Sequence, residues 1–319
     1  MVTLALASED EQRHRDLLTF APWGPPLTLE QYLRREVRLR GHRWPARAMR
    51  TWFLRDERGG VLSSCETFRM ASSVRAGGER LQGAAYGIAS VFTEDRLRGR
   101  GHAGELLRRV HQRLLAEDAA AQAFTLFSEV GAGLYERAGY TACREWDEDW
   151  IFPPSGATGP GAALPVPEAE LERALASAEP PDDELVIWPS VEQLDWHRER
   201  ERIYAGVLGR ALSPGCGAEH PGGVAIWAGN LRSRRLYLLL LRARTLEAAD
   251  ALIESARRAA CAARLDAVHL WRCPMPEGWA PERSGGRAAP REACLPMIHP
   301  LHPNAGAESW RFIPRAVWI

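Results

Sequence analysis

Residues 89–103 combine an apolar run, an arginine–glycine loop and the start of an amphipathic segment. The stretch reads Ala-Ser-Val-Phe-Thr-Glu-Asp-Arg-Leu-Arg-Gly-Arg-Gly-His-Ala. Gly99 and Gly101 let the backbone approach a ligand closely, with successive N–H groups pointing the same way. A helix that begins at about His102 adds its positive dipole end. The chemistry predicted here is the binding of an anion such as a pyrophosphate.

Two other phosphate-binding patterns fit this stretch less well. The dinucleotide pattern needs three glycines at fixed spacing and a later acidic residue, and the third glycine is missing. The nucleotide phosphate loop ends in Gly-Lys-Ser or Gly-Lys-Thr, and this chain contains no lysine. For this segment alone, an ordinary strand–turn–helix connection remains the alternative.

The loop resembles the acyl-CoA loop of the GNAT acetyltransferases, whose pattern is Gln/Arg-x-x-Gly-x-Gly/Ala. Arg98, Gly101 and Ala103 supply this pattern in register with the preceding strand. A second match, Arg96-x-x-Gly99-x-Gly101, is displaced by two residues, so the first is preferred. The resemblance implies that acetyl-CoA, as cosubstrate, is bound by the loop residues Arg98, Gly99, Arg100, Gly101, His102 and Ala103.

A second segment supports the same resemblance. Residues 124–140 read as a strand, a short loop, a short helix and a glycine stop. The superfamily pattern Phe/Leu-Tyr-x-x-x-Gly-Phe/Tyr is matched by Leu134, Tyr135, Gly139 and Tyr140. The asparagine that usually precedes this tyrosine by seven residues is Ser128 here. This departure puts the predicted cofactor contact at Ser128 in doubt.

Length and charge limit the classes of partner. A chain of 319 residues is long for one core, so two domains are expected. Hydrophobic residues make up 45% and charged residues 26%, which is typical of a soluble globular protein. Basic and acidic side chains number 41 each, so no net field attracts nucleic acid or an anionic membrane. We therefore expect a small-molecule partner.

The cysteines and the apolar runs indicate whether the chain binds a metal, which compartment it occupies and whether it crosses a membrane. The six cysteines form no Cys-x-x-Cys pair, and we expect reduced thiols in a cytoplasmic protein. Cys294, His299 and His302 lie close together, but the proline-rich sequence between them offers no fourth ligand, so no metal is predicted. No apolar run approaches the roughly 20 residues that span a bilayer, and no signal-peptide pattern opens the chain.

The order of predicted elements is that of the GNAT fold, an α+β fold with a mixed, splayed central sheet flanked by helices. We predict a catalytic domain over residues 1–152, a Pro/Gly-rich linker with a short helix over 153–184, and a second α+β domain over 185–319. In the first domain, residues 140–151 are expected to form the last strand pair. In the second, a strand–strand–helix–strand order suggests a degenerate GNAT-like copy without a glycine loop, closed by a strand over 310–318.

Several segments resemble the lysine N6-acetyltransferases of lysine catabolism, best known from yeasts. They are Ser-Cys-Glu-Thr-Phe-Arg at 64–69, Tyr-Gly-Ile-Ala-Ser-Val-Phe-Thr at 86–93, the 128–135 segment, and Trp-His-Arg-Glu-Arg-Glu-Arg-Ile-Tyr at 196–204. The resemblance implies direct acetyl transfer from acetyl-CoA to a primary amine, with the side-chain amine of free L-lysine as the family's acceptor. It leaves the acceptor of this chain open, with an antibiotic, a polyamine or a peptide amine as alternatives. It also leaves the oligomeric state open between monomer and homodimer.

In this fold the strand before the glycine loop and the next strand splay apart around the thioester. Backbone N–H groups near Val91 and Phe92 can then polarise the thioester carbonyl. The amine must lose a proton before it attacks, and Glu66 and Glu129 are the candidates that would take it. A solvated or salt-bridged carboxylate is the structural alternative for each.

Tyr135 is the predicted general acid. Its ordinary pKa of about 10 lies above the thiol value of about 8.5, so it can protonate the departing thiolate. The alternative is a packed tyrosine in a non-catalytic acyl-CoA sensor. Arg69, on the same predicted strand as Glu66, could bind an acceptor carboxylate through its planar fork.

Overall fold

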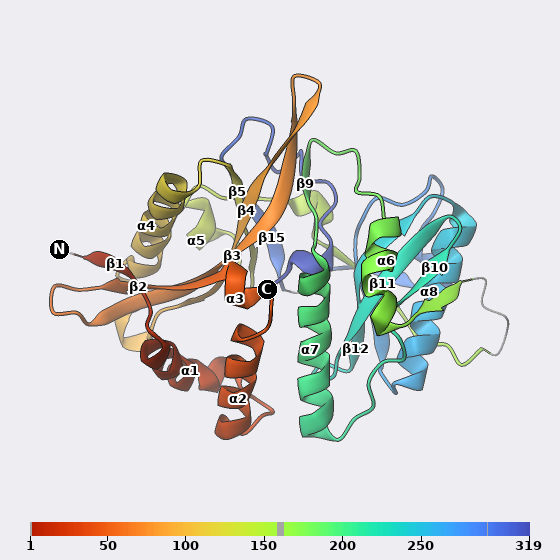
Figure 1. Cartoon of the computed structure of the whole chain (residues 1–319), viewed down its shortest axis with the longest axis horizontal. Helices are drawn as coiled ribbons and strands as arrows, with labels where there is room; N and C mark the ends of the chain where they lie inside the picture. The colour runs from red at the N-terminus through yellow and green to blue at the C-terminus, as the bar shows by residue number, and fades with distance from the viewer. Residues whose placement is uncertain (1, 158–162, 292) are drawn as a thin grey trace.

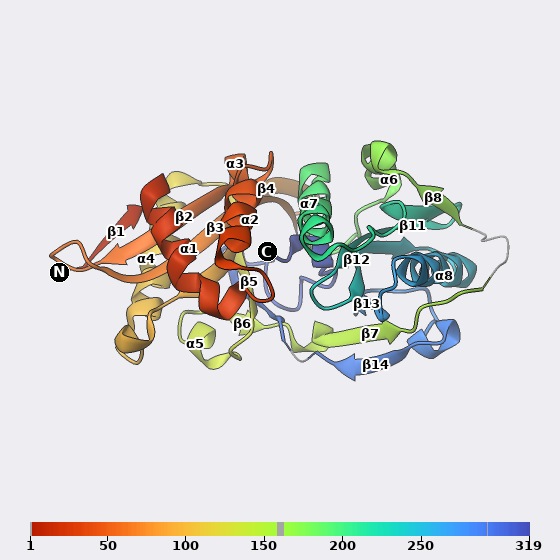
Figure 2. The ribbon, with the colours of Figure 1, turned by 90° about the horizontal axis from the view of Figure 1, so that it is seen from below.

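The computed structural model describes residues 2–157, 163–291 and 293–319. Two sheets lie side by side, and the long helix α7 (Val191–Leu208) stands between them (Figures 1 and 2). The first sheet has the strand order β1-β2-β3-β4-β5-β15-β6, with β9 paired to β3. Its strands are β1 (Thr3–Leu6), β2 (Met49–Arg55), β3 (Val61–Ala76), β4 (Glu79–Phe92), β5 (Ala121–Ser128), β6 (Thr141–Ala142), β9 (Leu185–Ile187) and β15 (Leu295–Pro300).

Helices cover both faces of the first sheet. The helix α4 (His102–Glu117) packs its apolar face, including Leu106 and Leu107, against one face together with Cys65 of β3. Because side chains alternate along a strand, Glu66 points to the opposite face, where it meets Arg15. The helices on that side are α1 (Glu9–Trp23), α2 (Leu29–Arg40) and the short α3 (Pro45–Ala48).

Reciprocal caps define where three of the helices begin. In each, an N-cap hydroxyl accepts from a backbone N–H, and the side chain three residues on accepts from the N-cap N–H. These capping boxes pair Ser8 with Glu11 in α1, Thr28 with Gln31 in α2, and Ser190 with Gln193 in α7.

The second sheet has the order β14-β7-β13-β12-β11-β10-β8. Its strands are β7 (Glu148–Phe152), β8 (Leu164–Val166), β10 (Gly217–His220), β11 (Gly223–Asn230), β12 (Arg235–Ala243), β13 (Ala267–Trp271) and β14 (Arg287–Pro290). The predicted strand–strand–helix–strand unit is present: β11 and β12 are antiparallel, and α8 (Leu246–Ala262) connects β12 to the parallel β13. The predicted linker helix is α6 (Leu171–Ser177).

Two strands are exchanged between the sheets relative to chain order. β7, expected to end the first sheet, pairs instead with β13 and β14 of the second sheet. β15 takes the place beside β5 in the first sheet, with Leu295 opposite Ser128 and Pro300 opposite Ala123. The prediction of a final strand pair over residues 140–151 is therefore wrong. Each sheet is completed by a segment from the other half of the chain.

The end of the chain also differs from expectation. Residues 310–318 form no strand; they run as irregular chain with a 3₁₀ turn over Arg315–Val317. Trp310 and Phe312 are buried there, and their aromatic character produced the strand prediction. Pro314 lies between them and the turn and lacks the N–H that a ladder needs. None of the helices in the described ranges is long and apolar enough to cross a membrane.

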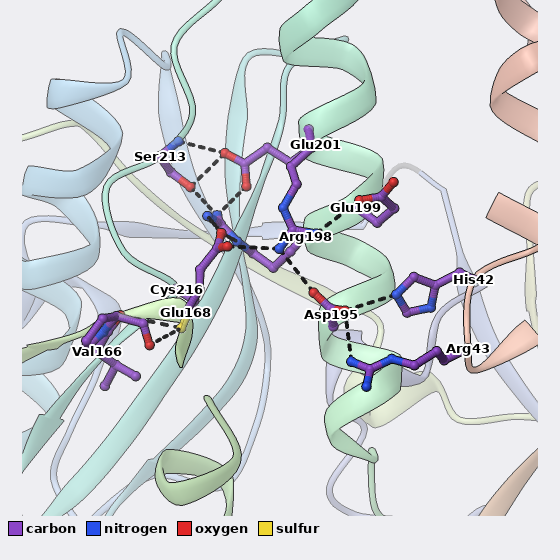
Figure 3. A network of polar contacts seen from close by, with 12 residues as sticks. His42, Arg43, Val166, Glu168, Asp195, Arg198, Glu199, Glu201, Ser213 and Cys216 are labelled. Atoms are coloured by element: carbon purple, nitrogen blue, oxygen red, sulfur yellow. Dashed lines mark hydrogen bonds and ion pairs between the residues drawn. The ribbon is translucent and has the colours of Figure 1, made fainter. Parts of the chain in front are cut away.

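A buried polar network ties α7 to the second half of the chain (Figure 3). Arg198 forms ion pairs with Glu201 and with Glu168. The N–H and the hydroxyl of Ser213 both donate to Glu201 at 2.7 Å. Glu201 has no exposed side-chain surface, so its charge depends on these partners.

The opposite side of α7 is tied to the first half. Asp195 lies 3.0 Å from the ring nitrogen of His42 and pairs with Arg43 (Figure 3). One helical turn further on, Glu199 pairs with Arg38 of α2. Contacts on two sides fix the rotation of α7 and therefore which of its side chains face the interior.

We predict that Glu201→Ala destabilises the protein by about 3–5 kcal/mol, because the variant removes the buried carboxylate that pairs with Arg198 and accepts from Ser213. The measurement is denaturant or thermal unfolding. Glu172→Ala removes one carboxylate from the exposed face of α6 and should change stability by less than about 0.5 kcal/mol. Equal losses in the two variants would contradict the role assigned to the network.

Candidate active site

A cavity of about 630 Å³ opens between the first sheet, α1, α2, α7 and the last residues of the chain. Figures 1 and 2 both place the C-terminus between α2 and α7. The cavity wall on the sheet side is formed by the ends of β4 and β5. The opposite wall is formed by aromatic and charged side chains, namely Trp23, Tyr32, Arg35, Glu36, Trp196, Arg200, Arg232 and Trp318.

The strands β4 and β5 diverge inside this cavity. Their parallel pairing runs from Ala84 opposite Ala121 and ends at Gly87 opposite Thr125. Beyond that point β5 remains paired with β15 to its end, and β4 remains paired with β3. Both diverging ends line the cavity, as the sequence predicted for a splayed sheet. The divergence opens a slot between two strand edges.

A β-bulge changes the direction of the end of β4. The β3–β4 register shifts between Ser64 and Glu66, and Ser90 adopts a left-handed conformation with φ 51°. Arg15 of α1 holds this bulge with three hydrogen bonds: to the Ser64 hydroxyl at 2.9 Å, to a Glu66 oxygen at 2.9 Å and to the Ser90 carbonyl at 2.6 Å. Bulges commonly reorient a strand next to a functional site. Here the reoriented residues are Val91 and Phe92, and both line the cavity.

The glycine loop lies where the sequence placed it. Gly99 and Gly101 have φ of 75° and 80°, the left-handed region that favours glycine. Gly101 is the N-cap of α4 and provides no side-chain cap. The first N–H groups of this 16-residue helix therefore have no side-chain cap, which is the arrangement that binds anions.

Of the predicted loop residues, Arg98 and Ala103 line the cavity. The Arg98 guanidinium donates to the Thr93 carbonyl at 3.0 Å and pairs with Asp95 at 2.9 Å. Among the described residues, Gly99, Arg100, Gly101 and His102 lie outside the cavity lining. A Cβ at Gly99 or Gly101 would meet nothing within 4 Å, so the space above this backbone is open.

Tyr135 lies on the short helix α5 (Gly133–Glu136) and is buried in the cavity wall. No described residue forms a hydrogen bond with its hydroxyl. Burial, followed by the nearby Cys65 and Glu129, raises the pKa of Tyr135 to about 12. The phenol therefore stays protonated at neutral pH and is free to donate into the cavity.

The two predicted carboxylates differ in their surroundings. Glu66 is buried and paired with Arg15, so its charge serves to hold the bulge. Glu129 follows the end of β5, lines the cavity and is exposed. Among the described residues it has no hydrogen bond or ion pair. Only Glu129 combines access to the cavity with an uncommitted carboxylate.

Two predicted contacts lie outside the cavity. The Ser128 hydroxyl donates to the Gly131 carbonyl at 2.6 Å and accepts from the Val130 N–H at 3.2 Å, so it shapes its own loop. Arg69 points to the α4 face of the sheet, where it pairs with Asp118 at 2.9 Å. The odd separation of Arg69 from Glu66 puts the two on opposite faces of β3.

Sequence reasoning missed the wall opposite the slot. Tyr32, Arg35 and Arg200 come from helices that are distant in the chain, and no local pattern distinguishes them from surface residues. One signal was available: Trp196 and Arg200 are four residues apart and so share a helix face. Trp196 is buried, and both Trp196 and Trp318 line the cavity.

Comparison with known proteins gives one family match over part of the chain and several matches of fold. Residues 166–299 match the family model described as the LYC1 GNAT-like C-terminal domain. The chain has the GNAT fold and resembles LYC1. A search of curated protein sequences gives no match. The predicted fold class is confirmed, and the predicted family resemblance is confirmed over residues 166–299.

Solved structures show the same fold over nearly the whole chain. A probable N-acyltransferase from Enterococcus faecalis V583 is 14% identical, with 97% of this chain and 74% of that chain covered and a TM-score of 0.62. A GCN5-related N-acetyltransferase from Kribbella flavida is 17% identical, covering 96% and 73%, with a TM-score of 0.53. One from Anabaena variabilis ATCC 29413 is 15% identical, covering 93% and 72%, with a TM-score of 0.54. At these identities the likeness concerns the fold.

Proposed function

We propose that the protein transfers the acetyl group of acetyl-CoA directly to a primary amine of a small molecule, with the side-chain amine of free L-lysine as the first acceptor to test. The observation that carries this proposal is the cavity itself. It joins the β4–β5 slot, the start of α4 and the Tyr135 side chain on one surface. The match to the LYC1 C-terminal domain supports lysine as the acceptor.

The residues fit acetyl-CoA on grounds of charge and space. The uncapped N–H groups of α4, with Gly99 and Gly101 beside open space, suit its pyrophosphate. The bound cosubstrate supplies an acetyl thioester that an amine can attack. We assign to the bulged backbone at Val91 and Phe92 the role of donating N–H groups to the thioester oxygen.

Proton transfer needs one donor and one acceptor. Tyr135 is assigned as the general acid for the departing thiolate, because its hydroxyl is protonated and has no protein partner. Glu129 is assigned as the group that takes the amine proton, directly or through a water, since its carboxylate is uncommitted. Glu66 is assigned a positioning role through Arg15.

We predict that the protein releases CoA from acetyl-CoA faster with L-lysine than with buffer alone. The experiment is a thiol-detection assay over a panel of amines that includes amino acids, polyamines and aminoglycosides. Mass spectrometry then locates the acetyl group, which is expected on the side-chain nitrogen. Turnover with another amine and none with lysine would remove lysine as the acceptor and keep acetyl transfer.

We predict that Gly101→Val weakens acetyl-CoA binding at least tenfold, about 1.4 kcal/mol. A β-branched residue is strained at φ 80°, and its side chain enters the space assigned to the pyrophosphate. Gly77→Val is the matched control, because Gly77 is also left-handed, at φ 59°, and open, but lies in the β3–β4 turn. Calorimetry should show normal affinity in the control; the same loss in both variants would point to general destabilisation.

We predict that Tyr135→Phe lowers kcat by about one to three orders of magnitude while acetyl-CoA affinity stays near wild type. The change removes a proton donor that acts only as the thiolate departs. Tyr140→Phe is the control: this buried hydroxyl contacts His111 at 2.8 Å and lies outside the cavity lining. A kcat within about twofold of wild type in Tyr135→Phe would reject the assignment. Tight acetyl-CoA binding without turnover of any amine would favour a sensor.

A further inference from the structure

Arg200 is a cation in the cavity wall for which the protein supplies no anion. It lines the cavity from α7, and among the described residues it has no hydrogen bond or ion pair. The two buried arginines that also line the cavity are paired: Arg15 with Glu66 and Arg35 with Glu36. We propose that Arg200 binds a carboxylate of the acceptor, so that the acceptors are amino acids and not simple amines. This inference rests on the proposed acetyl transfer.

The position of Arg200 is fixed by the helix that carries it. Arg200 lies one turn after Trp196, and both line the cavity. The neighbouring positions on α7 are held by Asp195 and Glu199 on one side and by Arg198 on the other (Figure 3). Since α7 cannot rotate without breaking these pairs, the Arg200 side chain is directed to the cavity side.

The surroundings of Arg200 favour an incoming anion. Its guanidinium lies over the Trp318 ring, 4.9 Å from the centroid, which orients the fork without neutralising it. The nearby anion, Glu36, is already paired with Arg35. Burial, and then the charge of Arg35, holds the pKa of Arg200 below its usual value. A carboxylate that pairs with Arg200 would relieve this unfavourable burial of positive charge.

The other arginines in the lining have different roles. Arg15 uses its fork on Ser64, Glu66 and Ser90. Arg98 pairs with Asp95 beside the glycine loop, and Arg232 is exposed and donates to the Trp23 carbonyl at 3.4 Å. Of these four arginines, only Arg200 has neither a hydrogen bond nor an ion pair with another described residue.

The arrangement favours an acceptor with two unlike ends. An amine at the β4–β5 slot and a carboxylate at Arg200 would place the carbon chain beside the aromatic side chains of Trp196 and Trp318. A polyamine would instead bring a second ammonium toward Arg200 and Arg35, and like charges repel in a partly buried site. The charged wall would thus favour amino acids over polyamines, although the amine of either could reach the β4–β5 slot.

The test compares two acceptors that share the reacting amine and differ in the carboxylate: L-lysine and 1,5-diaminopentane. We expect wild type to prefer lysine at least tenfold in kcat/KM. Arg200→Gln should lower kcat/KM for lysine at least tenfold, mainly through KM, and change that for the diamine by less than about twofold. Arg200→Lys should restore part of the preference. Arg34→Gln, which removes an exposed charge from α2, is the control and should retain it.

Failure of the inference is distinct from failure of acetyl transfer. If wild type and Arg200→Gln both show the same kcat/KM for lysine and for the diamine, the carboxylate site is wrong. Acetyl transfer itself would still stand. If a different amino acid is the acceptor, the same comparison is made with that acid and its decarboxylated amine. If no amine is acetylated, calorimetry with L-lysine and the diamine on CoA-saturated protein decides. Binding that requires both the carboxylate and Arg200 supports the site, and its absence rejects it.

Discussion

The exchange of β7 and β15 between the two sheets is the constraint on which the rest of the structure depends. β15 lies between β5 and β6, so the strand that forms one edge of the slot is supported by residues 295–300. β7 in turn is held between β13 and β14. Because strand pairing fixes register as well as position, the exchange ties both halves of the chain to one geometry. The cavity lies at the junction that results, with walls from both halves.

Arginine forks perform the fine positioning within this frame. Arg15 bonds two side chains of β3 and the bulge carbonyl of β4 at once, and Arg198 joins Glu201, Glu168 and Ser213. A planar guanidinium can make several bonds in fixed directions, whereas an ammonium acts as a point charge. The chain has arginine and no lysine, and its buried arginines hold neighbouring segments together through these bonds. Arg200 differs from the other arginines of the cavity lining because, among the described residues, it has no hydrogen bond or ion pair.

Residues assigned to cofactor binding could be predicted from the sequence, whereas few of those assigned to the acceptor could. The glycine loop, the start of α4 and the Tyr135 segment are local features whose residues are close in the chain, so spacing alone revealed them. Arg69 was misplaced because a strand pattern was read without its two-residue period, which puts residues 66 and 69 on opposite faces. The exchange of β7 and β15 was hidden because alternation indicates a buried strand face but does not identify its partner.

The same contrast appears between the two strand–helix units of the chain. In the first, α4 begins at an uncapped glycine, so its N–H groups remain available to a ligand. In the second, the Thr245 hydroxyl accepts from the Ala248 N–H at 3.1 Å, and α8 is capped by its own chain. A helix that is already capped gains less from an anion. The second unit instead contributes to the structural frame, and only Arg232, in its β11–β12 turn, is among the described residues that line the cavity. One half of the chain thus offers the uncapped helix start that the proposed function assigns to the cofactor, while residues of both halves line the cavity beside it.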